Sequence, residues 1–308
     1  MEKIFDVVII GSGPAGLSSG IYTGRALLKT LILNSFNYPS QAIFADVIEN
    51  YPGFYDGING FELIENFKKQ AEKFGCEMIN EEVVKIEEKE GNFFVYTLSS
   101  KNFFVSKSVI LATGRRSKKL GIENEDTLTG KGVSYCAVCD AMLYKDKTVA
   151  LVGGGDTAFS EAIFISRFVK KLYLIHRRKS FRATKILQKR LFEKENVIFY
   201  TPYVIEKILG EKKLQCLEIR NLDTNEKITI ECDGLFVCIG YQPNTEFLNG
   251  FIDLDDEGYI VTDENLNTSK KGIFACGDCR KGSTKQIIYA SAEGAKAGLS
   301  VVEFLENK

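Results

Sequence analysis

Short apolar runs that end on glycine are the most regular feature of the hydrophobic pattern. Residues 5–10 (FDVVII) form such a run before Gly11, and small or apolar residues fill the next twelve positions. This order is typical of a buried parallel strand that leads into a tightly packed helix. Residues 148–152, 158–168 and 172–175 repeat it as strand, helix and strand around a second glycine turn. The pattern therefore predicts two α/β halves.

Elsewhere the pattern predicts the elements that connect and complete these halves. A second strand is expected at 30–33, a loop at 34–58 and an amphipathic helix at 61–74. Residues 83–105 alternate apolar and polar positions around a Gly91-Asn92 turn, which indicates an antiparallel meander. The remaining expected elements are a buried strand at 109–112, a further meander, a strand at 235–239 and a long helix from about 284 to 305.

Two changes of domain follow from this pattern. The strand at 109–112 ends at Thr113-Gly114 and is followed by a basic, loop-like stretch, so one boundary is expected near residue 115. The strand at 235–239 ends at a stretch containing Gly240 and Pro243, which places a second boundary near residue 244. A chain of 308 residues is long enough for two domains of ordinary size.

Composition narrows the class of protein. The chain is 44% hydrophobic and 26% charged, as in soluble globular proteins. Its net charge of −1 gives no general basic field for nucleic acid or an anionic membrane. The first apolar run is too short for a signal peptide or a membrane span, and eight scattered cysteines do not suggest a secreted disulfide framework. We therefore expect a cytoplasmic protein, and the single histidine excludes a multi-histidine metal site.

The first glycine turn has the spacing of a dinucleotide fingerprint, Gly11-Ser12-Gly13-Pro14-Ala15-Gly16. Glycines at this spacing allow a tight turn, close approach to a pyrophosphate, and close packing of helix on strand. An ordinary strand–helix glycine turn is the alternative. Asn34 stands where an acidic residue often binds the ribose, and it can form a weaker hydrogen bond there.

The second turn, Gly153-Gly154-Gly155-Asp156-Thr157-Ala158, has a stronger context. The strand that ends at Ile175 is followed by His176-Arg177-Arg178, and Arg182 lies four residues further on. Arginines at this place suit the 2′-phosphate of NADP, because a guanidinium donates two hydrogen bonds to phosphate oxygens. A solvated basic loop is the alternative, and His176 is either a ligand or a packed ring.

Candidate redox chemistry lies just before the second turn, in Cys136-Ala137-Val138-Cys139-Asp140. Two cysteines at this spacing can close a disulfide at a helix start, where the helix dipole lowers the pKa of a thiol. Two alternatives stay open: inert buried cysteines, or half of a metal site shared with Cys276 and Cys279. Asp140 suits either a proton donor to a leaving thiolate or a helix N-cap.

A third glycine motif, Gly277-Asp278, follows an expected buried strand near the C-terminus. An aspartate at such a strand end is well placed to bind a polyol chain such as ribitol. We expect Asp278 to be the functional residue there. The flanking Cys276 and Cys279 are expected to be small buried residues beside a cofactor.

Over essentially its full length the chain resembles the low-molecular-weight bacterial thioredoxin reductases. The motifs that carry the resemblance are GSGPAG at 11–16, ENYPG at 49–53, ATG at 112–114, CAVCD at 136–140, GGGDTA at 153–158, HRRKSFR at 176–182, Gly240 with PNT at 243–245, and GD at 277–278.

The resemblance implies an α/β fold of two Rossmann-like domains (three-layer ββα) with antiparallel β-meanders, the second domain inserted into the first. Residues 1–115 and 245–308 would form an FAD-binding domain, and residues 116–244 an NADPH-binding domain with the redox-active disulfide. The implied FAD positions are Gly11, Ser12, Gly13, Pro14, Ala15, Gly16, Gln41, Asn50, Thr113, Gly114, Gly277, Asp278 and Gln286. The implied NADPH positions are Gly153, Gly155, Asp156, Thr157, His176, Arg177, Arg178 and Arg182.

The resemblance also implies a homodimeric enzyme without metal, in which NADPH reduces FAD, FAD reduces the Cys136–Cys139 disulfide, and the dithiol reduces a thioredoxin. Cys139 would face the flavin, Cys136 would react with thioredoxin, and Asp140 would act as the acid. Two stretches depart from the family pattern: Pro39-Ser40 replaces two glycines before Gln41, and Lys285 replaces an arginine before Gln286.

Hydride transfer and disulfide exchange both need the same flavin ring, so the second domain is expected to rotate between two orientations. Among enzymes, the rival is the reductase module of a peroxide-detoxifying system, which carries an additional thioredoxin-like region before its first glycine turn; no such region is expected here. A metal-binding or flavin-sensing protein without turnover is the rival from another class.

Overall fold

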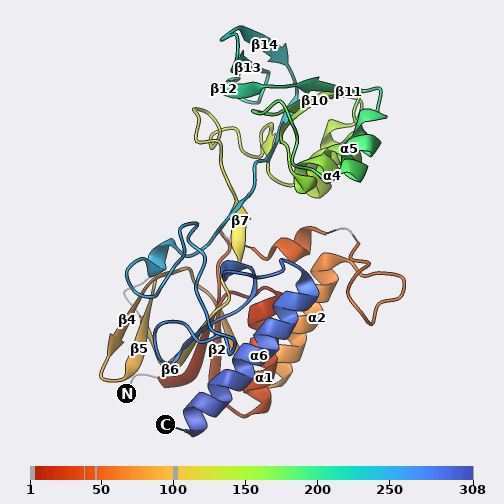
Figure 1. Ribbon diagram of the computed structural model, residues 1–308. Helices are drawn as coiled ribbons and strands as arrows, with labels where there is room; N and C mark the ends of the chain where they lie inside the picture. Colours follow the sequence, from red (N-terminus) through yellow and green to blue (C-terminus); the bar gives the residue numbers. More distant parts are fainter. Residues whose placement is uncertain (1–3, 38, 46, 100–102, 308) are drawn as a thin grey trace. The chain divides into compact units, whose positions relative to one another are not determined.

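The computed structural model describes residues 4–37, 39–45, 47–99 and 103–307, without the side chains of Val138 and Cys139. The chain divides into two compact units. Unit 1 comprises Met1–Arg116 and Gln242–Lys308, and unit 2 comprises Ser117–Tyr241. The two segments of unit 1 form one body although unit 2 lies between them in the sequence (Figure 1).

The central sheet of unit 1 has the strand order β3-β2-β1-β6-β5-β4, and β17 pairs with the end of β6. β1 pairs in parallel with β2 and β6, whereas β5 pairs antiparallel with β4 and β6. The strands are β1 (Ile4–Ile10), β2 (Thr30–Asn34), β3 (Glu77–Asn80), β4 (Val83–Lys89), β5 (Asn92–Thr97), β6 (Phe103–Leu111) and β17 (Ile273–Ala275).

β6 is one continuous strand where the hydrophobic pattern predicts two. Its first half pairs antiparallel with β5, and its last three residues pair in parallel with β17. β1 pairs in parallel with the opposite edge of β6. A single strand therefore belongs both to the meander and to the parallel sheet, which the local pattern cannot show because β17 is distant in sequence. The loop expected at 34–58 also contains a short 3-10 helix, η1 (Gln41–Phe44).

Three helices cover one face of this sheet (Figure 1). They are α1 (Pro14–Arg25), α2 (Gly60–Lys73) and α6 (Ile287–Glu306). Side chains alternate along β1, because successive residues of a strand point to opposite faces. Val7 and Ile9 pack in the core beneath the helices, whereas Val8 and Ile10 pack in the core on the other face.

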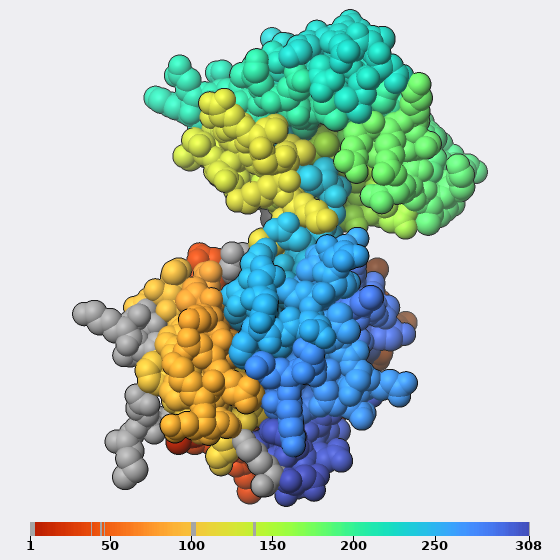
Figure 2. Space-filling view, turned by 60° about the vertical axis from the view of Figure 1, so that its left-hand side comes forward, coloured from red at the N-terminus to blue at the C-terminus, as the bar shows by residue number. Residues whose placement is uncertain are grey.

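On the second face of the sheet, the C-terminal segment of unit 1 and the β4–β5 hairpin contribute to one core. Figure 2 shows the blue C-terminal segment beside the orange segment that includes β4 and β5. Leu248, in the 3-10 helix η3 (Glu246–Leu248), packs in the same core as Ile86 of β4. The last part of the chain thus completes the fold that the first part begins.

Unit 2 has a five-stranded parallel sheet of order β11-β10-β9-β15-β8 and a separate antiparallel meander, β12-β13-β14. Its helices are α3 (Ala137–Asp140), α4 (Asp156–Ile165) and α5 (Lys185–Phe192), and η2 (Ala141–Tyr144) is a 3-10 helix. The strands are β8 (Val133–Ser134), β9 (Thr148–Gly153), β10 (Lys171–Ile175), β11 (Val197–Tyr200), β12 (Tyr203–Leu209), β13 (Cys216–Asn221), β14 (Lys227–Glu231) and β15 (Gly234–Cys238). The prediction of an α/β fold with parallel Rossmann-like sheets and antiparallel meanders is confirmed.

Two paired segments carry the chain between the units. β7 (Arg115–Ser117) pairs with β16 (Tyr241–Pro243) as a two-stranded sheet. Next to it, the Asn244 side chain donates to the Thr113 carbonyl at 2.9 Å and accepts from Arg116 at 2.8 Å. The Asn244 backbone N–H donates to the Gly114 carbonyl at 3.1 Å, so both passages are fixed at their unit 1 ends.

Close packing of α6 on α1 depends on Gly294. A Cβ atom added there would lie 2.1 Å from the Ala15 carbonyl oxygen. Because backbone atoms cannot give way easily, Gly294→Ala should lower the free energy of unfolding by about 1–3 kcal/mol. Thermal and denaturant unfolding measure this. Ala292→Ser, at an exposed position of the same helix, is the control, and equal stability of the two variants would contradict the packing argument.

Candidate functional site

A groove of about 270 Å³ in unit 1 gathers most residues of the first predicted cofactor site. It opens where β1, β6 and β17 end, and the residues that follow each strand line it. Ligands of open α/β sheets bind at this edge. The lining includes Gly11, Ser12, Gly13, Pro14, Ala15, Gln41, Thr113, Gly114, Gly277, Asp278 and Gln286.

The three glycines of the first turn differ in whether the surrounding protein has room for a side chain. Gly11 has a φ of +112°, and a Cβ there would lie 2.2 Å from the Ala112 carbonyl oxygen. A Cβ at Gly16 would lie 1.8 Å from the Gly11 carbonyl oxygen. At Gly13, in contrast, no protein atom comes closer than 3.5 Å. The protein itself requires the first and third glycines, whereas the second leaves space in the groove.

That space lies at the beginning of α1. Gly13 is the N-cap residue of this helix, and no side chain caps the helix there. The buried Ser40 hydroxyl, next to Gly13, has no hydrogen-bond partner among the residues that the structure describes. N–H groups at a helix start and an unsatisfied hydroxyl suit an anionic ligand, so these residues fit a dinucleotide pyrophosphate.

Several predicted flavin residues already bind one another. Asn50 donates to Gln286 at 3.1 Å, and Gln41 donates to the Arg115 carbonyl at 2.6 Å. Arg115 Nε lies 3.0 Å from the Asp278 carboxylate. Burial raises the pKa of Asp278, and the charge and hydrogen bond of Arg115 oppose that rise.

A second hollow of about 240 Å³ shares Gly11, Thr113 and Asn244 with the groove and extends to Asn34. Asn34 accepts a hydrogen bond from Ser12 at 2.5 Å and donates to Asn80 at 2.9 Å. The place where a ribose is expected is thus lined by an amide that is held in position.

Glu293 is a site residue that sequence analysis did not identify. Its carboxylate accepts from the Gly277 backbone N–H at 2.8 Å and from Arg280 Nε at 2.9 Å. This bond fixes the backbone of the Gly277-Asp278 turn. The only sequence signal was an acid among the apolar and small residues that begin the helix.

Cys276 and Cys279 are free, fully buried thiols that pack in different cores. Cys276 belongs to the core beneath the helices, and Cys279 belongs to the core on the other face of the sheet. Burial raises the pKa of both thiols, that of Cys279 to about 11. No group of three or more potential ligands for a metal ion occurs among the described residues. Full burial in two separate cores favours inert packing of these two thiols.

The glycine turn of unit 2 repeats the arrangement of the first. A Cβ at Gly153 would lie 2.4 Å from the Cys238 carbonyl oxygen, and one at Gly154 would overlap the His176 ring at 2.2 Å. A Cβ at Gly155 would have no described atom within 4 Å apart from the adjoining residues and the backbone of its own helix. Gly155 is also the N-cap residue of α4, without a side-chain cap. Gly155 therefore leaves space at a helix start, as Gly13 does in the first turn.

The loop after β10 closes onto this turn. The Arg182 N–H donates to the Gly154 carbonyl at 2.8 Å, and Asp156 accepts from the Thr184 N–H at 2.6 Å. Burial lowers the pKa of His176, and the nearby arginines add to this effect, so its ring is neutral at neutral pH. The ring packs against Phe181 with centroids 5.2 Å apart. Exposed side chains around the turn are Asp156, Thr157, Arg177, Arg178 and Arg182.

The candidate redox segment lies in unit 2 between β8 and β9. Cys136 is half-buried and disulfide-bonded, and the Cys139 side chain lies outside the described ones. Six other cysteines, Cys76, Cys216, Cys232, Cys238, Cys276 and Cys279, are free thiols. Asp140 ends α3 and precedes η2, but its side chain makes no capping hydrogen bond. Asp140 is thus the N-cap residue of η2 by position, without the side-chain hydrogen bond of a cap.

Glu125 is a second residue that sequence analysis missed. It is 2% exposed, and its carboxylate accepts from Tyr135 Oη at 2.7 Å, the Leu120 N–H at 2.8 Å and the Gly121 N–H at 2.7 Å. Burial and the Glu125 charge raise the pKa of Tyr135. These bonds tie the residue before Cys136 to the chain that enters unit 2.

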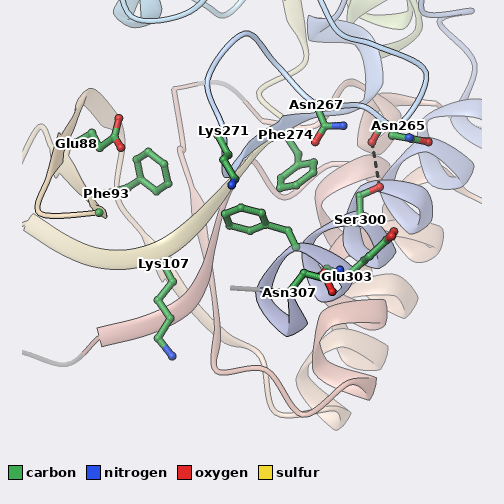
Figure 3. A pocket seen from close by; sticks show the side chains of 12 residues that line it. Glu88, Phe93, Lys107, Asn265, Asn267, Lys271, Phe274, Ser300, Glu303 and Asn307 are labelled. Atoms are coloured by element: carbon green, nitrogen blue, oxygen red, sulfur yellow. Dashed lines mark hydrogen bonds between the residues drawn. The ribbon is translucent and has the colours of Figure 1, made fainter.

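A hollow of about 480 Å³ lies elsewhere in unit 1, between the β4–β5 hairpin and the C-terminal part of α6 (Figure 3). Its lining includes two acids, Glu88 and Glu303, and two bases, Lys107 and Lys271. None of the residues predicted to react or to bind a cofactor lines it.

Among the described helices, none is both long and apolar enough to cross a membrane.

Known proteins match this sequence and fold over nearly the whole chain. The family model described as pyridine nucleotide-disulphide oxidoreductase matches residues 5–294. The thioredoxin reductase of Rickettsia typhi is 41% identical, covering 99% of both chains, and that of Streptomyces coelicolor is 40% identical, covering 99% of this chain and 95% of the relative. The crystal structure of Lactococcus lactis thioredoxin reductase (FR conformation) matches with a TM-score of 0.87 at 37% identity, covering 99% of this chain and all of that one.

A glycine turn at a helix start in each unit, with a disulfide before the second turn, defines an oxidoreductase of two dinucleotides. The chain belongs to the pyridine nucleotide-disulphide oxidoreductase family and, within it, to the low-molecular-weight thioredoxin reductases, which are NADPH-dependent flavoproteins.

The two kinds of glycine in the second turn should respond differently to substitution. Gly155→Ala should leave stability nearly unchanged, because the added Cβ meets no protein atom, but it should weaken NADPH binding on the order of tenfold. Gly153→Ala, in contrast, should lower the melting temperature, because its Cβ meets the Cys238 carbonyl. Thermal unfolding and NADPH titration of both variants measure this, and a destabilised Gly155→Ala would contradict the assignment.

Proposed function

We propose that this enzyme is a thioredoxin-disulfide reductase in which the Cys136–Cys139 disulfide is the redox-active centre. The net reaction converts NADPH, a proton and a disulfide into NADP⁺ and a dithiol, so two electrons are transferred. The observation that supports it most strongly is that the disulfide-bonded Cys136 precedes a glycine turn with free space, and that three exposed arginines flank this turn.

The residues of the unit 1 groove suit FAD. FAD, when bound, would supply the two-electron carrier between the nicotinamide and the disulfide. Gly13 and the start of α1 would hold its pyrophosphate, and Ser40 would donate to it. Asp278, Gln286 and Asn50 would line the flavin end, while Asn34 would bind a ribose at the other end.

The unit 2 turn suits NADPH. Gly155 and the start of α4 would hold the pyrophosphate, and Arg177, Arg178 and Arg182 would bind the 2′-phosphate. His176 would have a supporting role without contact to the phosphate. Its neutral, packed ring fills the space beside Gly154 and fixes the loop that carries the arginines.

The dithiol would act in two exchange steps. The Cys136 thiolate attacks the thioredoxin disulfide, forms a mixed disulfide and displaces one thioredoxin thiolate, which Asp140 protonates. The Cys139 thiolate then attacks the Cys136 sulfur, which restores the intramolecular disulfide and releases the second thioredoxin sulfur. The surface beside the cysteines suits a protein substrate, because Met142 and Leu143 are 57% and 68% exposed. The yellow segment that leads to them lies on the surface of its unit (Figure 2).

Rotation of unit 2 is the mechanical part of this proposal. The nicotinamide site and the disulfide belong to one unit, yet each must contact a flavin held by the other unit. Since the two linkers are short paired strands, a twist of β7 and β16 can exchange the two groups without unfolding either unit.

We further propose that the enzyme is a homodimer, which sedimentation can test.

Following the flavin absorbance tests the electron route. NADPH should bleach the flavin, and a thioredoxin should restore its colour. Failure to bleach would remove the NADPH assignment, and bleaching without reoxidation by any thioredoxin would remove the substrate assignment.

Cys139→Ser separates the two half-reactions. We expect this variant to accept hydride from NADPH normally and to reduce thioredoxin only at background rate, because the second exchange step has lost its nucleophile. Cys216→Ser, at a free, half-buried thiol of the same unit, is the matched control and should behave as the wild type. Thioredoxin reduction by Cys139→Ser would contradict the proposal.

The arginines should determine coenzyme preference. Arg178→Ala with Arg182→Ala should raise the KM for NADPH by about ten- to a hundredfold and leave the KM for NADH unchanged, since charge-assisted hydrogen bonds to the 2′-phosphate are lost. Lys189→Ala, at an exposed position of α5, controls for loss of a positive charge from the same unit. An equal change for both coenzymes would show that the arginines do not bind the 2′-phosphate.

A further inference from the structure

The Arg115 side chain occupies the proposed flavin groove, although sequence analysis assigns it only to a basic loop. It is the first residue of β7, and its carbonyl accepts the hydrogen bond from Gln41. Its side chain is 16% exposed and that of Asp278 is 23% exposed, so their contact is largely shielded from water. The contact joins Arg115 Nε to the Oδ2 atom of the Asp278 carboxylate at 3.0 Å.

The next residue shows that this placement is particular to Arg115. Successive strand residues point to opposite faces, and Arg116 turns to the adjoining hollow, where it forms an ion pair with Glu246. In that hollow the cation is neutralised by an acid at the base of the linker. In the groove, Arg115 instead meets an acid that is itself expected to bind the cofactor.

The charges around Asp278 leave the groove positive. Arg115 and Lys285 are the cations that lower its pKa, and Glu293 is the further acid that raises it. Arg280 forms an ion pair with Glu293. Two cations, Arg115 and Lys285, therefore act on the one carboxylate of Asp278, in a partly buried place where charges are weakly screened.

We propose that Arg115 is a flavin-positioning residue, which orients the Asp278 carboxylate toward the cofactor and provides a fixed positive charge beside it. This inference rests on the proposed binding of FAD in the groove. The oriented carboxylate accepts a hydrogen bond from a cofactor hydroxyl. The guanidinium favours the more negative form of the cofactor, so it should raise the midpoint potential of the bound flavin.

Arg115→Ala and Arg115→Lys test the two parts of the proposal. Arg115→Ala should bind FAD about tenfold more weakly or worse and shift the flavin midpoint potential to more negative values. Arg115→Lys keeps the charge and should restore the potential, but only part of the affinity, because a lysine ammonium lacks the fixed guanidinium geometry. Lys119→Ala, which removes an exposed charge from the same segment, should change neither quantity. Wild-type affinity and potential in Arg115→Ala would overturn the proposal.

The pH dependence of FAD binding provides a readout that loss of structure would not mimic. Burial raises the pKa of Asp278, so removal of Arg115 should raise it further, with Lys285 as the remaining opposing cation. A protonated Asp278 cannot accept the cofactor hydrogen bond as a carboxylate does. FAD binding to Arg115→Ala should therefore weaken as the pH falls through the raised pKa, while wild-type binding stays constant over that range. Parallel pH profiles would overturn the orienting role.

A double-mutant cycle with Asp278→Asn shows whether Arg115 acts through Asp278. Substitution of Arg115 in the Asp278→Asn background should cost less FAD affinity than in the wild type, whereas additive losses would contradict the inference. Far-ultraviolet circular dichroism of each cofactor-free variant verifies that it folds. These measurements use FAD alone, so they distinguish failure of this inference from failure of NADPH or thioredoxin to react.

Discussion

Hydride transfer and thiol–disulfide exchange both require contact between the reacting atoms, because neither step works over a gap. In this chain the first glycine turn belongs to one compact unit, and the disulfide-bonded Cys136 and the second glycine turn belong to the other. On the proposed electron route, two groups of unit 2 would reach a flavin held in unit 1 in turn. The short paired linkers between the units suit that requirement.

Both proposed cofactor sites contain glycines of two kinds. In each turn, some glycines are required because a Cβ would meet the neighbouring strand, helix or ring. One glycine in each, Gly13 or Gly155, meets no close protein atom and stands at an uncapped helix start. The structure thus distinguishes glycines that the fold requires from glycines that leave room for the proposed anionic ligand. The motif alone does not make this distinction.

Local pattern predicted most of the fold, because strands and helices depend on residues close in sequence. It predicted the strand–turn–helix order of both units. The glycine motifs and their spacing also indicated Asp278, Arg177, Arg178 and Arg182 as candidate binding residues. It did not reveal that β6 is continuous, that Cys276 and Cys279 face different cores, or that Glu125, Glu293 and Arg115 hold key segments. These features depend on pairing between residues far apart in the chain, to which hydrophobic periodicity is blind.

Restraint of the two units relative to each other tests the proposed rotation of unit 2. A chemically cleavable cross-link without a disulfide, placed between unit 1 and unit 2, should stop thioredoxin reduction while at most one half-reaction of the flavin continues. Cleavage of the cross-link should restore full turnover. Unchanged turnover by fully cross-linked enzyme would contradict the rotation of unit 2, and with it the account of how one flavin serves both partners.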